Sequence, residues 1–223
     1  MSGFGTQECG LHLLDDARRA QHCFLDSADR CRYLWDYLPG RAPVWPQRWI
    51  RDLKCRPSLA AAWPLRAKYK ERAIARAAQA LRAAAPRSWV EQASWCPMPP
   101  SAMPGAADYD DRLLRLLQIA FAGYDADIRP LIHLSQTLPA DHCRRRRVSF
   151  SALYELMSVD TAQLSRRALR MELVLFDDVL TTGKHFKCAQ GRLQERLDPM
   201  SISACVLARR VLSQKRRGVY GAG

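Results

Sequence analysis

The sequence lacks any apolar run long enough to cross a membrane. No window of its 223 residues reaches the roughly 18 uninterrupted apolar residues that a membrane span needs. The opening residues, MSGFGTQECG, also lack the basic and then apolar segments of a secretory signal. The chain contains no internal repeat and no low-complexity domain. These absences predict a cytoplasmic protein that has no membrane partner.

Acidic residues are scarce relative to basic ones. The chain has 35 Lys and Arg against 22 Asp and Glu, which gives a formal net charge of +13. Such a surplus predicts attraction to an anionic partner, which is a phosphorylated metabolite, a nucleic acid or nucleoprotein, or an acidic protein. Charge alone does not choose among them.

The eight cysteines lack the spacing of a disulfide framework or of paired zinc-binding motifs. They are scattered along a mid-sized chain, which favours reduced thiols. Cys9 and His12 form one C-x2-H pair, but His22, Cys23 and Cys31 do not supply a second closely spaced pair. The pattern therefore favours ordinary thiols over a zinc site.

The chain divides near residue 60 into an aromatic N-terminal part and a more regular remainder. Residues 1–60 are rich in Trp and Tyr and are interrupted by Pro and Gly, which predicts a hood or subdomain of short helices and loops. Its tryptophans, Trp35, Trp45 and Trp49, are expected to pack this subdomain onto the core, with stacking on a flat base as the alternative. Residues 61–223 are expected to form the core and a basic C-terminal tail.

Helical and strand patterns alternate in this remainder. Helical spacing of apolar residues appears over 68–85, 108–124 and 184–197. Strand patterns appear over 89–96, 128–136, 172–177 and 201–208. The continuous apolar run at 172–177 is typical of a strand that is buried on both faces of a parallel sheet. The alternation predicts an α/β fold with a mostly parallel, twisted sheet flanked by helices.

The stretch MELVLFDDVLTTGKHFKCA, residues 171–189, is the most informative part of the chain. An apolar strand pattern ends in two aspartates, and Thr-Thr-Gly then leads into a new helical pattern. In a parallel α/β unit, ligands bind at the loop that follows the carboxyl end of a strand. Backbone N–H groups at the start of the helix, from Thr181 to His185, would cradle a phosphate. Gly183 allows close backbone approach, and the hydroxyls of Thr181 and Thr182 add donors.

The two aspartates, Asp177 and Asp178, have a different role from the phosphate cradle. Carboxylates accept hydrogen bonds and repel anions, so these side chains cannot bind the same phosphate. They can accept hydrogen bonds from a pair of sugar hydroxyls or help to hold a divalent cation. The combination describes a site for a ribose 5-phosphate. The alternative is a simple strand-to-helix turn in which the aspartates cap the helix.

This stretch resembles the 5-phosphoribosyl pyrophosphate (PRPP) signature of type I phosphoribosyltransferases. The signature has four apolar residues, two acidic ones, two more residues and Thr-Thr-Gly, and LVLF-DD-VL-TTG fills each position. After the glycine the family has a small residue and then Thr or Ser, whereas this chain has Lys184 and His185. Weaker similarity to the competence-type (ComF-like) branch extends over roughly residues 52–210. It lies in the segments DLKCRP, KYKERAIARAAQAL, CPMPPS and SISACVLARR.

The resemblance implies a type I phosphoribosyltransferase fold. It also implies that the protein is a glycosyltransferase that binds PRPP and Mg²⁺. It would transfer the phosphoribosyl group to a nitrogen nucleophile and release pyrophosphate. It implies that Asp177 and Asp178 are catalytic and hold Mg²⁺, directly or through other ligands. The PRPP-binding residues that it implies are Thr181, Thr182, Gly183, Lys184, His185, Pro99, Pro100 and Ser101.

A mobile loop at 142–151 is also implied, in which Arg144 and Arg145 would neutralise the leaving pyrophosphate. A solvated basic patch or a nucleic-acid contact is the alternative role for these arginines. The acceptor and the oligomeric state stay open.

Two other functions remain open beside catalysis. The first is a non-catalytic PRPP-fold module in a nucleic-acid-handling, DNA-uptake or antiphage assembly. The basic surplus, the uncharged PMPPS segment and the residues after Gly183 favour it. The second is a regulator that senses PRPP, which predicts binding without turnover.

Overall fold

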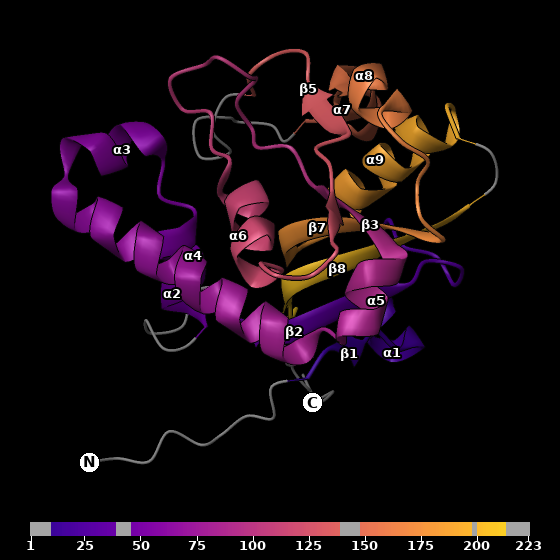
Figure 1. Ribbon diagram of the computed structural model, residues 1–223, viewed down its shortest axis with the longest axis horizontal. Helices are drawn as coiled ribbons and strands as arrows, with labels where there is room; N and C mark the ends of the chain where they lie inside the picture. Colours follow the sequence, from indigo (N-terminus) through magenta and orange to yellow (C-terminus); the bar gives the residue numbers. More distant parts are fainter. Residues whose placement is uncertain (1–9, 39–45, 139–147, 198–199, 213–223) are drawn as a thin grey trace, which may run out of the picture.

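A six-stranded sheet forms the centre of the molecule (Figure 1). The computed structural model describes residues 10–38, 46–138, 148–197 and 200–212. The sheet order is β1-β2-β8-β7-β3-β4, and every neighbouring pair is parallel except β1 with β2. The strands are β1 (His12–Leu13), β2 (Cys31–Tyr37), β3 (Ala93–Pro97), β4 (Asp127–Ile128), β7 (Glu172–Leu180) and β8 (Ser201–Arg210). The predicted α/β class with a mostly parallel sheet is confirmed.

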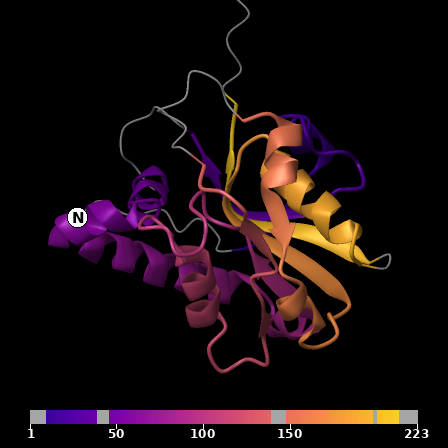
Figure 2. The ribbon, with the colours of Figure 1, turned by 90° about the horizontal axis from the view of Figure 1, so that it is seen from above.

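Helices flank this sheet on both faces. Figure 2 shows α4 and α6 on one side of the strands and α9 on the other. The helices are α1 (Asp16–Arg19), α2 (Gln47–Leu53), α3 (Pro57–Ala62), α4 (Pro64–Ala84), α5 (Arg87–Gln92), α6 (Arg112–Ala120), α7 (Phe150–Leu156), α8 (Thr161–Ser165) and α9 (Lys184–Gln194). A separate antiparallel pair joins β5 (Ile132–Leu134) to β6 (Met157–Val159).

The helices predicted from apolar spacing are present. In α4 the buried side chains include Ile74, Ala77, Ala78 and Leu81, which share one helical face. This helix begins with Pro64, whose missing N–H costs nothing in the first turn, and it ends before Pro86. The predicted segments 108–124 and 184–197 contain α6 and α9.

The core holds the signature strand in place. Residues 173–176 of β7 are at most 1% exposed, because β3 and β8 pair with both of its edges and helices cover its faces. Trp95 of β3 is fully buried and makes edge contacts with Phe121 and Phe176, at centroid distances of 4.8 and 6.5 Å. The carboxyl ends of β3, β7 and β8 therefore meet at one rigid edge of the sheet.

Two parts of the sequence prediction differ from the structure. The strand predicted over 89–96 is wrong in its first half, where α5 forms a helical turn after Pro86 and β3 begins only at Ala93. Residues 31–37, which were expected among short helices and loops, form β2 and pair with β8. The main sheet therefore extends across the predicted domain boundary at residue 60. Local residue propensity does not predict where β2 and β3 form, because pairing with strands distant in sequence determines it.

Several features of the described residues bear on the remaining sequence predictions. The six cysteines in the described ranges are free thiols. No three His, Cys, Asp or Glu side chains gather as metal ligands in those ranges, and Cys9 lies outside them. None of the helices there has the length and apolar character that crossing a membrane would require.

Candidate functional site

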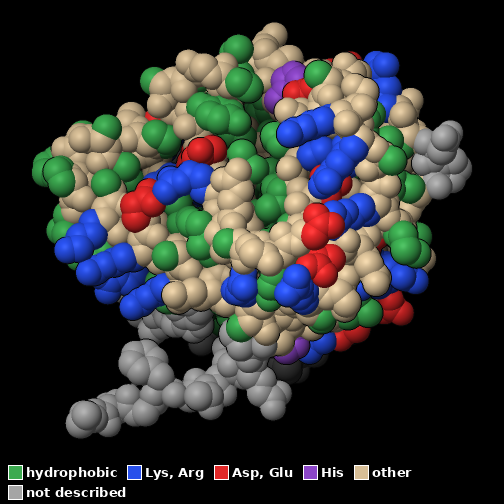
Figure 3. Space-filling view, in the orientation of Figure 1, with side chains coloured by type: hydrophobic (Ala, Val, Ile, Leu, Met, Phe, Trp, Pro, Cys, Tyr) green, Lys and Arg blue, Asp and Glu red, His purple; other side chains and the backbone are tan. Residues whose placement is uncertain are grey.

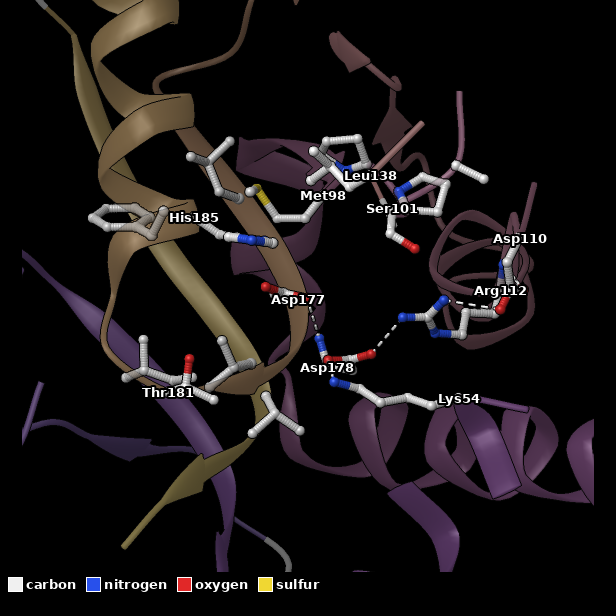
Figure 4. Close-up of a pocket in the computed structure, with 18 of the residues that line it drawn as sticks. Lys54, Met98, Ser101, Asp110, Arg112, Leu138, Asp177, Asp178, Thr181 and His185 are labelled. Carbon is white, nitrogen blue, oxygen red and sulfur yellow. Dashed lines mark hydrogen bonds and ion pairs between the residues drawn. The ribbon is translucent and has the colours of Figure 1, made fainter. Parts of the chain in front are cut away.

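A pocket of about 510 Å³ lies at the carboxyl ends of β3 and β7 and against Ala204 and Val206 in the middle of β8. Figure 4 shows its side chains converging from the signature strand, the start of α9 and the chain around Arg112. The pocket brings together eight of the residues predicted from the sequence. These are Asp177, Asp178, Thr181, Gly183, His185, Pro99, Pro100 and Ser101. Two segments about 80 residues apart in sequence thus contribute to one site, as the PRPP interpretation requires.

Four predicted site residues are not in this pocket lining. Arg144 and Arg145 lie outside the described residues. Thr182 and Lys184 do not line the pocket. The Lys184 ammonium donates a hydrogen bond to the carbonyl of Val148. The structure therefore directs the Lys184 charge to the chain before α7, and not into the cradle that precedes α9.

The loop predicted to bind pyrophosphate is fixed to the signature strand. Beyond β3, the N–H of Met98 donates to the carbonyl of Phe176 in β7 over 2.8 Å. Further along, the carbonyl of Ser101 accepts a 2.7 Å hydrogen bond from the N–H of Leu138. The first contact joins the start of the Pro99–Ser101 segment to β7, and the second joins its end to the chain at Leu138.

The turn from β7 into α9 requires glycine at position 183. Gly183 has φ +84° and caps the helix, and a Cβ there would lie 2.6 Å from a side-chain carbon of Leu25. The first N–H groups of any α-helix lack carbonyl partners within the helix, and the helix dipole makes its N-terminus attractive to anions. The start of α9, with Gly183 and His185 in the pocket wall, is therefore suited to a phosphate.

Residues 22–24 of the N-terminal segment contact the turn from β7 into α9. The Nδ1 atom of His22, a fully buried residue, lies 2.5 Å from the carbonyl oxygen of Thr181. The N–H of Phe24 donates to the carbonyl of Thr182 over 3.0 Å. Burial, partly opposed by the Thr181 contact, lowers the pKa of His22, which favours the neutral ring. Sequence analysis missed this role, because no local pattern links residues so far apart in the chain.

The two aspartates of the signature lie in different environments, because successive strand residues face opposite sides of the sheet. Asp178 is 2% exposed, and its two oxygens pair with Lys54 at 2.9 Å and Arg112 at 2.6 Å. Asp177 lines the pocket without an ion pair in the described part of the chain. Its Oδ1 accepts the N–H of Asp178 over 2.7 Å (Figure 4).

These environments move the two pKa values in opposite directions. Burial raises the pKa of Asp177, and the negative charge of Asp178 adds to that effect, so that it reaches about 7. Burial also opposes ionisation of Asp178, but the charges of Lys54 and Arg112 outweigh it and hold its pKa well below the usual value. The pair therefore favours one ionised carboxylate, Asp178, and one neighbour, Asp177, whose ionisation is opposed.

A chain of alternating charges extends from Asp178 into the protein. Arg112 also pairs with Asp110 at 2.9 Å, and the buried Lys70 of α4 pairs with Asp110 at 2.7 Å. Lys70 further donates to the carbonyl of Cys55 over 2.6 Å. Buried charges are tolerated when each is paired and hydrogen-bonded. This network of ion pairs connects α4 and α6 to Asp178 in the pocket lining. The segments DLKCRP and KYKERAIARAAQAL contain Lys54 and Lys70, but no local pattern indicates their ion pairs or that of Arg112, since the partners are distant in the chain.

The charges in the pocket wall nearly balance. The basic side chains are Lys54, Arg56 and Arg112, and the acidic ones are Asp108, Asp110, Asp177 and Asp178. A polyanionic ligand would therefore need added positive charge. Mg²⁺ binds proteins through one or two carboxylates and completes its shell with water and ligand phosphates. Asp177 fits that use directly, whereas Asp178 would join it only by giving up a contact with Lys54 or Arg112.

Comparison with protein-family models, with curated proteins and with solved structures found no match for this chain. The functional argument therefore rests on the pocket geometry and on the sequence signature at the end of β7.

Proposed function

We propose that this protein binds PRPP with Mg²⁺ and transfers its phosphoribosyl group to a nitrogen nucleophile, with release of pyrophosphate. A type I phosphoribosyltransferase fold is part of this proposal. The observation that carries it is the shared pocket, in which the end of β7, the start of α9 and the Pro99–Ser101 loop form one wall. The signature residues and a second segment of the resemblance thus lie within reach of one ligand.

Each part of PRPP has a matching group in the pocket. The 5-phosphate suits the start of α9, where backbone N–H groups and the helix dipole favour an anion. The ribose hydroxyls suit Asp177, which lines the pocket and has no ion pair among the described residues. For these hydroxyls, the ionised carboxylate of Asp177 is a stronger hydrogen-bond acceptor than the protonated one.

Lys54 and Arg112 supply the positive charge that the Pro99–Ser101 loop lacks. Both side chains line the same pocket as that loop. The Lys54 side chain is 44% exposed, whereas that of Arg112 is 15% exposed and shared between two aspartates. Lys54 would therefore exchange its ion pair with Asp178 for a pyrophosphate group more readily than Arg112 would. This arrangement supports pyrophosphate binding beside the ribose.

In the proposed reaction the bond from the anomeric carbon to pyrophosphate breaks, its electron pair leaves with pyrophosphate, and a bond to nitrogen forms. The residues that would hold Mg²⁺ are Asp177 and Asp178, and the ion would neutralise charge on the pyrophosphate. The chain's own contribution is placement and electrostatic stabilisation by Lys54, Arg112 and the start of α9.

The test is pyrophosphate release from PRPP and Mg²⁺ over a panel of nucleobases and amines. We expect release with at least one acceptor, loss of release in Asp177→Asn, and full activity in the control Asp16→Asn. Asp16 is a suitable control because its side chain is 92% exposed and lies outside the pocket. Equal rates in wild type and Asp177→Asn would contradict the assignment of the site.

A second candidate is a module or regulator that binds PRPP without turnover. The ion pairs of Asp178 favour it, because both oxygens of that carboxylate are already engaged by Lys54 and Arg112. PRPP binding with no pyrophosphate release from any acceptor would select this candidate over the transferase.

A further inference from the structure

A large share of the positive charge of this protein lies in the segment from α2 to α4. Residues 47–84, which span α2 to α4, contain ten Lys and Arg and two Asp and Glu, a surplus of eight out of the net charge of +13. Figure 3 shows a row of Lys and Arg side chains along the lower left edge of the molecule, where α4 lies in Figure 1. Basic and acidic side chains are interspersed elsewhere on that face.

Helix α4 carries basic residues at helical intervals. Lys68, Arg72 and Arg76 follow one another at i, i+4 and i+8 on α4, so they share one face and lie about 6 Å apart along the axis. All three are exposed, and none has an ion pair in the part of the chain that the structure describes. Like charges at this spacing destabilise a helix. A bound anion would remove that destabilisation.

Aromatic rings lie close to two guanidinium groups on this side of the molecule. Helix α2 lies against α4. The guanidinium carbon of Arg48 in α2 lies 5.9 Å from the ring centre of Tyr69 in α4. In the reverse direction, Arg76 lies 5.1 Å from the Trp49 ring in α2. Both guanidinium groups are thus within the roughly 6 Å at which a cation is attracted to a ring face. An unpaired base stacks on a guanidinium plane, and its phosphates contact the neighbouring charges.

We propose that Arg48, Lys68, Arg72 and Arg76 form a binding surface for single-stranded nucleic acid, without sequence preference. Phosphate groups provide the complementary charge for the row on α4. The guanidinium planes of Arg48 and Arg76 accept unstacked bases, which a duplex does not offer. This surface is separate from the residues that line the pocket, and it does not depend on PRPP binding.

The test compares two triple variants that remove equal charge. The surface variant carries Arg48→Gln, Arg72→Gln and Arg76→Gln. The control carries Arg30→Gln, Arg166→Gln and Arg196→Gln, three exposed arginines outside the surface. Fluorescence anisotropy measures binding of a labelled oligothymidylate of about 20 nucleotides, longer than the roughly 4–16 nucleotides that such grooves occupy. A duplex of the same length and anionic phospholipid vesicles are tested alongside it, and thermal melting confirms that both variants fold.

For the surface variant we expect the Kd for the single strand to rise at least about tenfold, with a salt dependence shallower by about 2 in the log–log slope, since each lost contact removes about 0.7. The control should bind within about twofold of wild type, because its charges lie elsewhere. Equal weakening of both variants would show a diffuse charge effect and overturn the proposal. So would a surface variant that binds like wild type, tighter binding of duplex or vesicles, or no wild-type binding at low salt.

Discussion

Asp177 is the pocket carboxylate whose ionisation the fold opposes. Burial and the adjacent charge of Asp178 raise its pKa to about 7, well above that of an aspartate in an unfolded chain. The native state therefore binds more protons than the unfolded state between about pH 4 and 7. Stability is lost as the pH rises through that window, because Asp177 must then ionise inside the fold. Asp177→Asn removes this titration and keeps an oxygen for the N–H of Asp178.

The magnitude follows from the size of the shift. Roughly three pKa units correspond to about 4 kcal/mol between the two ends of the window, as an upper limit because Asp177 is only partly buried. Between about pH 5 and 8.5 the free energy of unfolding of Asp177→Asn should therefore gain up to about 2–3 kcal/mol relative to wild type.

Urea denaturation at these two pH values measures the difference. Asp16→Asn serves as the control, and its free energy of unfolding should follow that of wild type. A gap between Asp177→Asn and wild type that stays constant with pH would refute the reasoning. The same titration predicts that PRPP with Mg²⁺ binds wild type more tightly as the pH rises through about 7, because the ionised carboxylate is the better acceptor.

Two further substitutions test the turn and the buried charges. Gly183→Ala should destabilise the protein by about 1–3 kcal/mol and weaken PRPP binding, because φ is +84° and the new Cβ meets Leu25; unchanged urea denaturation and calorimetric affinity would contradict this. Arg112→Met should lower the free energy of unfolding by about 3–5 kcal/mol, because the buried charge of Asp178 then loses one of its two partners. Adding Asp178→Asn should restore part of that stability. Lys54→Met should cost less stability, because its side chain is 44% exposed, and a cost equal to that of Arg112→Met would contradict this account of the ion pairs.

Sequence patterns predicted the parts of the fold that local periodicity specifies. The helical spacing within α4 and the apolar run of β7 identify their elements, because each buries a regular set of side chains. The turn at Gly183 was predictable as well, since strand, Thr-Thr-Gly and helix form one contiguous signal. Residues 31–37 could not be placed, because their strand character depends on pairing with β8, about 170 residues later in the chain.

The same distinction applies to the site. The signature predicted Asp177, Asp178 and the cradle at α9, which are adjacent in sequence. It did not predict the partners of Asp178, since Arg112 lies 66 positions away. The opposite electrostatic environments of the two aspartates follow from these partners. The proposed binding of PRPP therefore depends on these ion pairs as much as on the signature.

Calorimetric titration of PRPP into the protein, with and without Mg²⁺, tests the central claim most directly. The account predicts Mg²⁺-dependent binding that Asp177→Asn weakens by about tenfold or more, the effect of losing one hydrogen bond to a charged acceptor. Asp16→Asn should bind like wild type. An affinity for PRPP that is no tighter in wild type than in Asp177→Asn would contradict the assignment of this pocket to PRPP.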